Sequence, residues 1–217
     1  KRVGVKDVKY DIVTIEPSSQ HEIAGRKFTF FQTTHSAMHS FGIGLDTSQG
    51  TIVYSGDFII EYTNSARYKL DLNSIAKIAE KNVLCLLSES SGAEKAGYTS
   101  PTHRLTTHIV PVFREVKGRI FISLYDQGTY NIEELVQVVM AAKRKIAFYD
   151  PQTEEYFRDF ERAGLSLIDE RLIISNDDLL RVRDQDIVIL MLGAGARLFQ
   201  KIFALSNREN PDKKIVL

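Results

Sequence analysis

The chain has 217 residues, of which 43% are hydrophobic and 26% are charged, and its 28 Lys and Arg residues balance 28 Asp and Glu residues. This composition is typical of a globular protein and excludes a disordered tail, a collagen and a coiled coil. Because the chain as a whole is neutral, a nucleic acid would have to bind a local basic patch. No apolar run reaches the roughly 18 residues that a membrane-spanning helix needs, so we expect no membrane contact.

The only cysteine is Cys85, which lies in the apolar run 83–87. A lone cysteine excludes an intramolecular disulfide and fits a reducing cytosol. We therefore predict a cytoplasmic protein in which Cys85 is buried and unreactive. The chain begins without Met and ends on the strand-like residues 215–217, so we expect a fragment of a longer protein.

The first half of the chain has the pattern of a strand-rich unit. Alternating or aromatic-rich runs predict successive antiparallel strands over residues 10–15, 27–34, 41–46 and 51–54. Asp71 begins a predicted helix with an apolar face, followed by a buried strand at 83–87 and a polar loop at 88–97. The apolar face consists of Leu72, Ile75, Ala76 and Ala79. A further helix starts near Pro101 and either kinks at Pro111 or breaks there into two pieces.

After Gly118 the pattern changes to alternating strands and helices. Strands are predicted over residues 120–124, 146–149, 172–174 and 186–192. Helices are predicted over residues 130–143, 153–163 and 197–206, with a short one near Asp177. This alternation predicts a parallel sheet and an α/β fold class. The change of pattern places a domain boundary near residue 117, with one domain over 1–117 and a second over 118–217.

Two candidate metal ligands stand at predicted strand ends. His35 follows the strand that ends in Thr33 and Thr34, and Asp57 follows the 51–54 strand after Gly56. Imidazole and carboxylate are both common metal ligands, although such residues at strand ends more often form turns or lie on the surface. His39 is a weaker candidate still.

Two loops could contact a ligand. Glu89 stands among small hydroxyl residues after the 83–87 strand, where a simple capping role is the alternative. Gly193, Ala194 and Gly195 join a strand to a helix, where free backbone amides could receive a phosphate. A full dinucleotide-binding fingerprint is absent. His103 and His108 are expected on the surface of the helix after Pro101.

The order of these motifs resembles the RNase J family, in the β-CASP branch of the metallo-β-lactamase superfamily. The resemblance rests on Thr-His-Ser at 34–36, Ser-Gly-Asp-Phe at 55–58, Ser-Glu-Ser-Ser-Gly at 88–92 and Gly-Arg-Ile-Phe-Ile at 118–122. It implies part of a metallo-β-lactamase αββα sandwich, followed by a β-CASP domain with a parallel sheet. It also implies metal-dependent hydrolysis of RNA by a pair of zinc ions.

The resemblance also implies roles for single residues. His35 would be a zinc ligand and Asp57 a bridging, catalytic ligand, while Glu89 would be a catalytic acidic residue that hydrogen-bonds near the metal ligands. RNA would be contacted by two loops, one containing Ser90 and Ser91 and the other containing Gly193, Ala194 and Gly195.

The chain departs from the family pattern in three places. Residues 35–40 read His-Ser-Ala-Met-His-Ser where the family usually has His-Ser-Ile-Pro-Asp-Ser, and residues 88–92 replace Ser-Asp-Ser-Thr-Asn. The family's His-x-His-x-Asp-His motif has no counterpart. These departures favour a likeness to the weaker second paralogue, and they predict that this chain is inactive alone.

Two other interpretations stay open. In the first, the protein is a non-catalytic partner subunit that associates with an RNase J paralogue or with itself. In the second, it is an unrelated α/β protein that binds a small molecule through the loop at Gly193.

Overall fold

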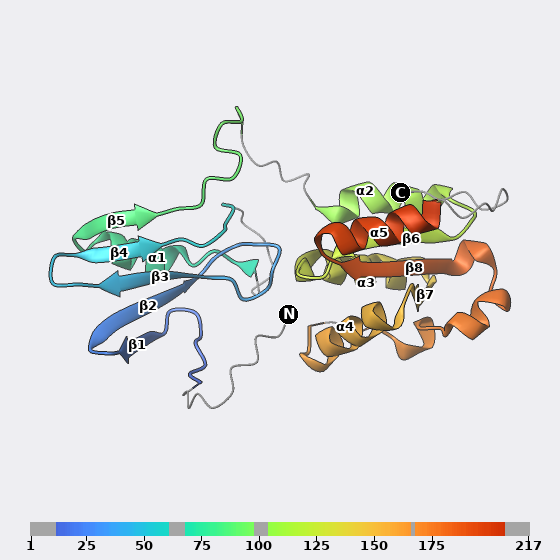
Figure 1. Ribbon diagram of the computed structural model, residues 1–217, viewed down its shortest axis with the longest axis horizontal. Helices are drawn as coiled ribbons and strands as arrows, with labels where there is room; N and C mark the ends of the chain where they lie inside the picture. The colour runs from blue at the N-terminus through green and yellow to red at the C-terminus, as the bar shows by residue number, and fades with distance from the viewer. Residues whose placement is uncertain (1–11, 61–67, 98–103, 166–167, 207–217) are drawn as a thin grey trace. The chain divides into compact units, whose positions relative to one another are not determined.

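The computed structural model describes residues 12–60, 68–97, 104–165 and 168–206, and these pack into two compact units (Figure 1). The first unit contains the chain up to His35 and then His39–Glu94, and the second contains Ser36–Met38 and the chain from Lys95 onward. The helix α2 (Leu105–Glu115) thus belongs to the second unit, where it packs on α3 (Thr129–Ala142). The sequence pattern predicts a domain boundary near residue 117, where the alternation of strands and helices begins after α2, and that boundary stays a prediction.

A five-stranded sheet forms the first unit. Its order is β1-β2-β3-β4-β5. Neighbouring strands from β1 to β4 are antiparallel to each other, and β5 is parallel to β4. The strands are β1 (Gln20–Ile23), β2 (Arg26–Gln32), β3 (Phe41–Asp46), β4 (Thr51–Tyr54) and β5 (Val83–Leu87). The strands predicted over 27–34, 41–46, 51–54 and 83–87 are confirmed.

The strand predicted over residues 10–15 is wrong for residues 12–15, which form no strand, while residues 10 and 11 lie outside the described part. The strand next to β2 is instead β1, which the sequence analysis missed. Ala24 and Gly25 join β1 to β2 with φ angles of 51° and 70°. Positive φ at both turn positions matches the twist of a tight hairpin, so the turn selects β1 as the partner of β2.

The helix α1 (Leu72–Ala79) begins at the predicted residue, since the carboxylate of Asp71 accepts a hydrogen bond from Ser74 N at 3.0 Å. Its buried side chains are Ser74 and Ile78, and the predicted apolar face is only partly right: Ile75 packs against the core, whereas Leu72 is 45% exposed. Ser18 contacts the same side of the helix: its hydroxyl donates to Asp71 Oδ2 at 2.7 Å and accepts from Ser74 Oγ at 3.0 Å.

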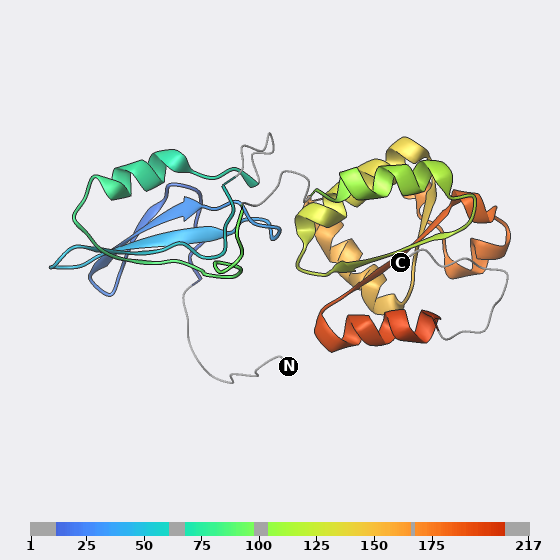
Figure 2. The same cartoon turned by 90° about the horizontal axis from the view of Figure 1, so that it is seen from above.

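The strand β5 is exposed along its whole length, and Cys85 with it. The prediction of a buried strand with a buried cysteine is therefore wrong. α1 packs over the sheet at Phe31 and Val53, which lie on β2 and β4, whereas β5 is the edge strand. Figure 2 shows α1 on one face of this sheet only. The apolar run has the composition of a core strand, but it lies at the edge of the sheet. Within the described residues, no other element covers it.

The second unit contains a three-stranded parallel sheet in the order β6-β8-β7. The strands are β6 (Ile120–Tyr125), β7 (Lys145–Phe148) and β8 (Ile187–Gly193), and the further helices are α4 (Pro151–Arg162) and α5 (Gly195–Ser206). The predicted parallel sheet is confirmed, as are its main strands and helices. Figure 2 shows α2 and α3 on one face of the sheet and α5 on the other.

Two details of the second unit differ from the predictions. The strand predicted over 172–174 is wrong: the short helix η3 (Glu170–Leu172) occupies its start, and only the bridge between Ile173 and Ile146 remains. The short helix near Asp177 is confirmed as η4 (Asn176–Leu180). α2 continues through Pro111 as one helix, and the helix start predicted near Pro101 lies outside the described residues.

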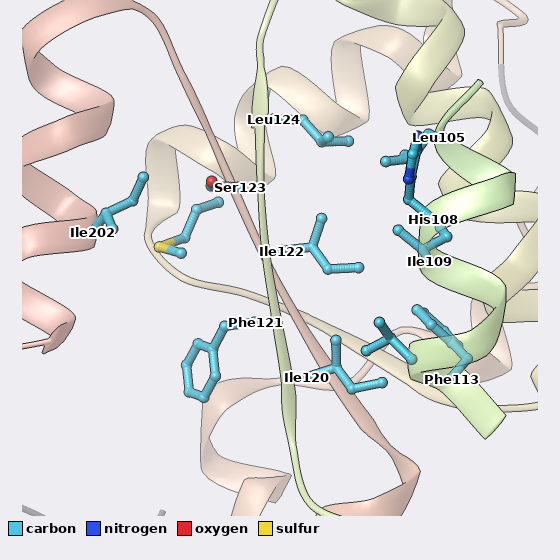
Figure 3. Close-up of a pocket in the computed structure, with 12 residues that line it drawn as sticks. Leu105, His108, Ile109, Phe113, Ile120, Phe121, Ile122, Ser123, Leu124 and Ile202 are labelled. Atoms are coloured by element: carbon cyan, nitrogen blue, oxygen red, sulfur yellow. The ribbon is translucent and has the colours of Figure 1, made fainter. Parts of the chain in front are cut away.

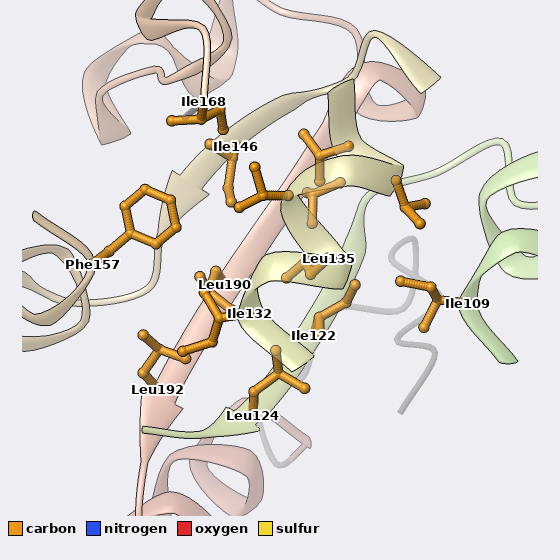
Figure 4. Packing of buried hydrophobic residues seen from close by; sticks show 14 of the residues in the cluster. Ile109, Ile122, Leu124, Ile132, Leu135, Ile146, Phe157, Ile168, Leu190 and Leu192 are labelled. Carbon is orange, nitrogen blue, oxygen red and sulfur yellow. The ribbon is translucent and has the colours of Figure 1, made fainter. Parts of the chain in front are cut away.

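The main core lies between the parallel sheet and the helices α2, α3 and α4 (Figure 4). Alternate residues of β6, such as Ile122 and Leu124, point into it, together with Leu190 of β8. Met191, the next residue of β8, packs on the opposite side against Leu198 of α5. β8 is therefore buried on both faces, which explains why its sequence is a continuous apolar run instead of an alternating one.

Candidate functional site

The structure brings the two predicted metal ligands together. His35 Nε2 lies 3.8 Å from Asp57 Oδ2, and the two side chains are 36% and 68% exposed. β2 and β4 are both antiparallel to β3, so they run in the same direction and their carboxyl ends lie at the same end of the sheet. Residues 22 positions apart in the sequence meet for this reason.

Backbone hydrogen bonds hold the two strand ends in register. Ile59 N donates to the Thr34 carbonyl at 2.9 Å, and Thr33 Oγ1 donates to the Asp57 carbonyl at 3.5 Å. Thr33 N also donates to the Ser40 carbonyl at 2.9 Å, which closes the base of the loop that carries His35. These bonds hold the main chain near His35 and Asp57 in place, so the two side chains start from neighbouring strand ends.

The pair fits part of a metal-binding site. Two ligands of one tetrahedral zinc ion lie about 3.4 Å apart, because each is about 2.1 Å from the metal, and the observed 3.8 Å is close to that separation. Within the described residues, no group of three or more His, Cys, Asp and Glu side chains forms a cluster that could hold a metal. Two side chains are fewer than the three or four protein ligands of a zinc site, so a metal held by His35 and Asp57 would need further ligands.

Glu89 leaves the same edge of the sheet as Asp57, because β5 is parallel to β4 and Ser55 N donates to the Leu87 carbonyl at 3.0 Å. The Glu89 carboxylate accepts a hydrogen bond from Ser91 N at 2.7 Å. A hydrogen bond of this kind agrees with the capping role of Glu89, which is the alternative to a catalytic role. Ser90 and Ser91 follow Glu89 in the same loop, and both are exposed.

The loop at Gly193, Ala194 and Gly195 belongs to the second unit. Gly193 ends β8, and Gly195 begins α5 with a φ of 52°, a conformation that glycine adopts without strain. Ala194 and Gly195 are exposed, so the loop lies open to solvent at the start of α5. Asp126 N donates to the Gly193 carbonyl at 3.1 Å and connects the loop to the end of β6.

Near the end of β8, Asp150 and Lys201 form an ion pair that the sequence analysis does not predict. Lys201 of α5 lies 2.7 Å from Asp150 and donates to the Leu192 carbonyl at 2.8 Å. Burial raises the pKa of Asp150, but hydrogen bonds from Lys201 and Thr153 lower it by more. The pKa of Asp150 therefore lies below its ordinary value. Asp150 directly before Pro151 indicates a helix start in the sequence. No local pattern near Asp150 indicates its partner Lys201, because that residue lies about fifty positions later in the chain.

A cavity of about 340 Å³ lies along β6 in the second unit (Figure 3). Its walls are mainly apolar side chains of β6 and α2, such as Ile122 and Phe113, and its polar lining residues are Ser123 and His108. His108 is exposed on α2, as predicted. None of the predicted site residues lines this cavity, so it is separate from the chemistry expected at His35 and Asp57.

None of the helices in the described ranges combines the length and the apolar character that crossing a membrane requires.

Comparison with known proteins identifies relatives over nearly the whole chain. Ribonuclease J 2 of Staphylococcus saprophyticus is 30% identical over 211 residues, and that of Staphylococcus epidermidis is 29% identical over 211 residues. Each match covers 97% of this chain and 37% of the relative. Ribonuclease J 2 of Staphylococcus aureus is 29% identical over 187 residues, covering 86% of this chain and 34% of the relative. The chain thus spans little more than a third of the length of these relatives.

No protein-family model matches the chain. A crystal structure of a protein of unknown function from Enterococcus faecalis V583 aligns with 89% of this chain and 47% of its own, with a TM-score of 0.55 and 13% identity. That likeness concerns the fold alone. The fold is α/β, with a parallel sheet in the second unit. Over the region that it spans, the chain is similar to proteins named Ribonuclease J 2.

Proposed function

We propose that the chain is part of a metal-dependent ribonuclease that hydrolyses RNA phosphodiester bonds and is weakly active in its full-length form. The observation that carries this proposal is the 3.8 Å approach of His35 Nε2 to Asp57 Oδ2 at neighbouring strand ends, in a chain whose relatives are named ribonucleases. Imidazole and carboxylate together are a donor set that suits zinc.

In this proposal His35 would be a zinc ligand and Asp57 would be a bridging ligand of the zinc pair. A bound metal ion lowers the pKa of a coordinated water and neutralises charge that develops on the phosphate. Because two side chains cannot complete two zinc shells, further ligands must come from outside the described residues. This chain by itself should therefore hold substoichiometric zinc and cleave no RNA.

The other predicted site residues have supporting roles in this proposal. Glu89 orders its loop through the Ser91 amide, so that the hydroxyls of Ser90 and Ser91 face the RNA. The exposed amides near Ala194 and Gly195, at the start of α5, receive a phosphate of the RNA backbone, because unpaired amides and the helix dipole favour an anion there.

A second candidate function is a non-catalytic partner subunit of an RNase J complex, formed with a paralogue or with another copy of the protein. The hydrogen bond from Ser91 N to Glu89 favours it, because that bond engages the carboxylate in ordering its own loop. The altered motifs at residues 35–40 and 88–92 favour it as well.

The test is Asp57→Asn in the full-length protein, meaning this chain together with the regions that its relatives have beyond it. The amide keeps the size of the side chain, and the Asp57 side chain is 68% exposed, so the fold should persist in a thermal melt. We expect RNA cleavage to be lost and association with an RNase J paralogue to be retained. The control is Asp177→Asn, an exposed carboxylate on η4.

Folded Asp57→Asn that cleaves RNA at the parent rate would refute the nuclease proposal. A parent protein that cleaves no RNA but stabilises an active paralogue would establish the partner role instead. Elemental analysis of this chain alone adds an independent check, since a pair of tightly held metal ions per chain would contradict the incomplete shell.

A further inference from the structure

A small polar pocket lies in the first unit, where α1 meets β1 and β2, and it has a volume of about 70 Å³. Its most buried lining residues are Thr29 of β2 and Ser74 and Ile78 of α1, which are 6%, 5% and 3% exposed. Ser18 and Gln20 line it at the start of β1. All of these residues belong to the first unit, so the pocket is a feature of that unit alone.

The Thr29 hydroxyl is a buried polar group in this pocket that lacks a hydrogen bond. Thr29 lies directly across from Gln20 in the register of β1 and β2. Its Oγ1 atom is buried and has no partner within the part of the chain that the structure describes. Buried side-chain polar atoms nearly always bond to protein, to ordered water or to a bound group. The unpaired hydroxyl therefore indicates an occupant of the pocket that can bond to it.

The charge of the lining shows which occupant fits. Among the described residues that line the pocket, the charged ones are Lys77 and Lys81, which lie four positions apart and so on one side of α1 and its end. Lys81 Nζ donates to both carboxylate oxygens of Asp46, at 3.0 Å and 2.8 Å, so its charge is compensated. Lys77 is exposed at the rim, and no carboxylate of the described residues lines the pocket beside it. The lining therefore favours a negative occupant.

The nearest carboxylate on the α1 side is Asp71, and it already has its own donors. Asp71 Oδ2 accepts from Ser18 Oγ at 2.7 Å, and Asp71 Oδ1 accepts from Ser74 N at 3.0 Å. Ser74 Oγ in turn donates to Ser18 Oγ at 3.0 Å. The hydroxyls of these two serines thus give their protons to the Asp71 side, which leaves the donors of Thr29, Gln20 and Lys77 for an occupant.

We propose that this pocket is a binding site for an oxyanion the size of one phosphate group. Its oxygens would accept from the Thr29 hydroxyl, the Gln20 amide and the Lys77 ammonium group, and a charge-assisted bond to an ammonium group is the strongest of the three. A pocket of about 70 Å³ admits such a group, whereas pockets for larger ligands measure about 300 Å³ or more. His35 and Asp57 do not line this pocket, so the site is separate from the proposed metal ligands.

The experiment titrates the full 217-residue chain with inorganic phosphate at constant ionic strength, and NMR follows the backbone amides of Thr29 and Ser74. We expect both amides to shift with one Kd on the order of 1–10 mM, as a few hydrogen bonds at an open site would give. Lys77→Met should raise this Kd about 10-fold, and Thr29→Val about 5-fold. Thr29→Ser keeps the hydroxyl and should stay within about twofold of the parent.

The matched control is Lys69→Met, which removes one positive charge from the same unit. Lys69 is exposed and does not line the pocket, so this variant should change the Kd by less than about twofold. A thermal melt examines the hydroxyl itself. Without phosphate, Thr29→Val should melt no lower than the parent, because the hydroxyl has no bond to lose. In about 50 mM phosphate, the melting temperature of the parent should rise by more than that of Thr29→Val.

Three results would overturn the site. The first is an absence of shifts at Thr29 and Ser74 in the parent. The second is an unchanged Kd in both Lys77→Met and Thr29→Val, which would mean that phosphate binds elsewhere. The third is a lower melting temperature of Thr29→Val without phosphate, joined to a parent that phosphate does not stabilise, because ordered water would then be the partner of the hydroxyl.

A further titration distinguishes two sources of the phosphate group. A short RNA without terminal phosphates that shifts the same amides, and does so more weakly in Lys77→Met, would identify a phosphate of an RNA backbone. An RNA that leaves these amides unchanged while inorganic phosphate shifts them would identify a free phosphate ion. In both cases the three donors of the pocket bind the same chemical group.

Discussion

Arg144 caps the carboxyl end of α2 from the neighbouring part of the fold, and its removal should destabilise the second unit. The side chain is buried, and the residue is 6% exposed. Its guanidinium donates to the carbonyls of Phe113 at 3.2 Å, Val116 at 2.7 Å and Gly118 at 3.2 Å, and it lies 5.4 Å from the centre of the Phe113 ring. Carbonyls at the end of a helix have no partner within the helix, and here one cation binds three carbonyls at and just beyond that end.

The magnitude follows from those three bonds. Arg144→Met keeps most of the apolar stem and leaves three carbonyl oxygens without their donor. An unsatisfied buried group costs about 1–3 kcal/mol. Only the bond to Phe113 is fully buried, while those to Val116 and Gly118 are partly buried and water can replace them in part. Taking the lower end for all three, we expect a loss of about 3 kcal/mol in the free energy of unfolding of the second unit.

The assay is urea unfolding followed by circular dichroism, with hydrogen exchange to report on the amides of α2. Arg144→Lys should lose about half as much as Arg144→Met, because an ammonium group lacks the planar fork that reaches several acceptors. Arg162→Met serves as the control, since the Arg162 side chain is 70% exposed and its ion pair is with Asp159 of the same helix; we expect a change below about 0.5 kcal/mol. A loss below about 0.5 kcal/mol for Arg144→Met would refute the capping argument.

Three further predictions concern other parts of the molecule. Glu134 is 6% exposed and accepts from Leu105 N at 2.8 Å at the start of α2, so Glu134→Leu should cost about 1–2 kcal/mol in urea unfolding, and a neutral result would contradict its capping role. The lowered pKa of Asp150 beside Lys201 means that its contribution to stability is present above pH 3.8 and is lost as the pH falls through the lower, folded-state pKa. The deficit of Asp150→Asn against the parent should therefore be largest near pH 7 and shrink below about pH 4, whereas a constant deficit in unfolding at both pH values would exclude the pairing. Leu86 is 62% exposed on β5, so Leu86→Lys should change the melting of this chain by less than the equivalent of about 0.5 kcal/mol, and a large loss would mean that β5 is covered.

The elements of this protein follow mainly from short-range patterns in the sequence. The start of α1 at Asp71 depends on a side chain and an amide three residues apart. The alternation of strands and helices after Gly118 predicts a parallel sheet, because parallel strands need a crossover connection. The strand–turn–strand pattern at 41–54 likewise depends on neighbouring residues. Each of these features is confirmed, since the interactions that produce it join residues close together in the chain.

Burial and the arrangement of the site depended on tertiary structure. The apolar run 83–87 has the composition of a core strand, yet its place at the edge of the sheet leaves Cys85 exposed. The proximity of His35 and Asp57 follows from the shared direction of β2 and β4. The composition of a segment does not indicate whether its strand lies at the edge of a sheet or which distant residues it contacts. Both depend on how the whole chain packs.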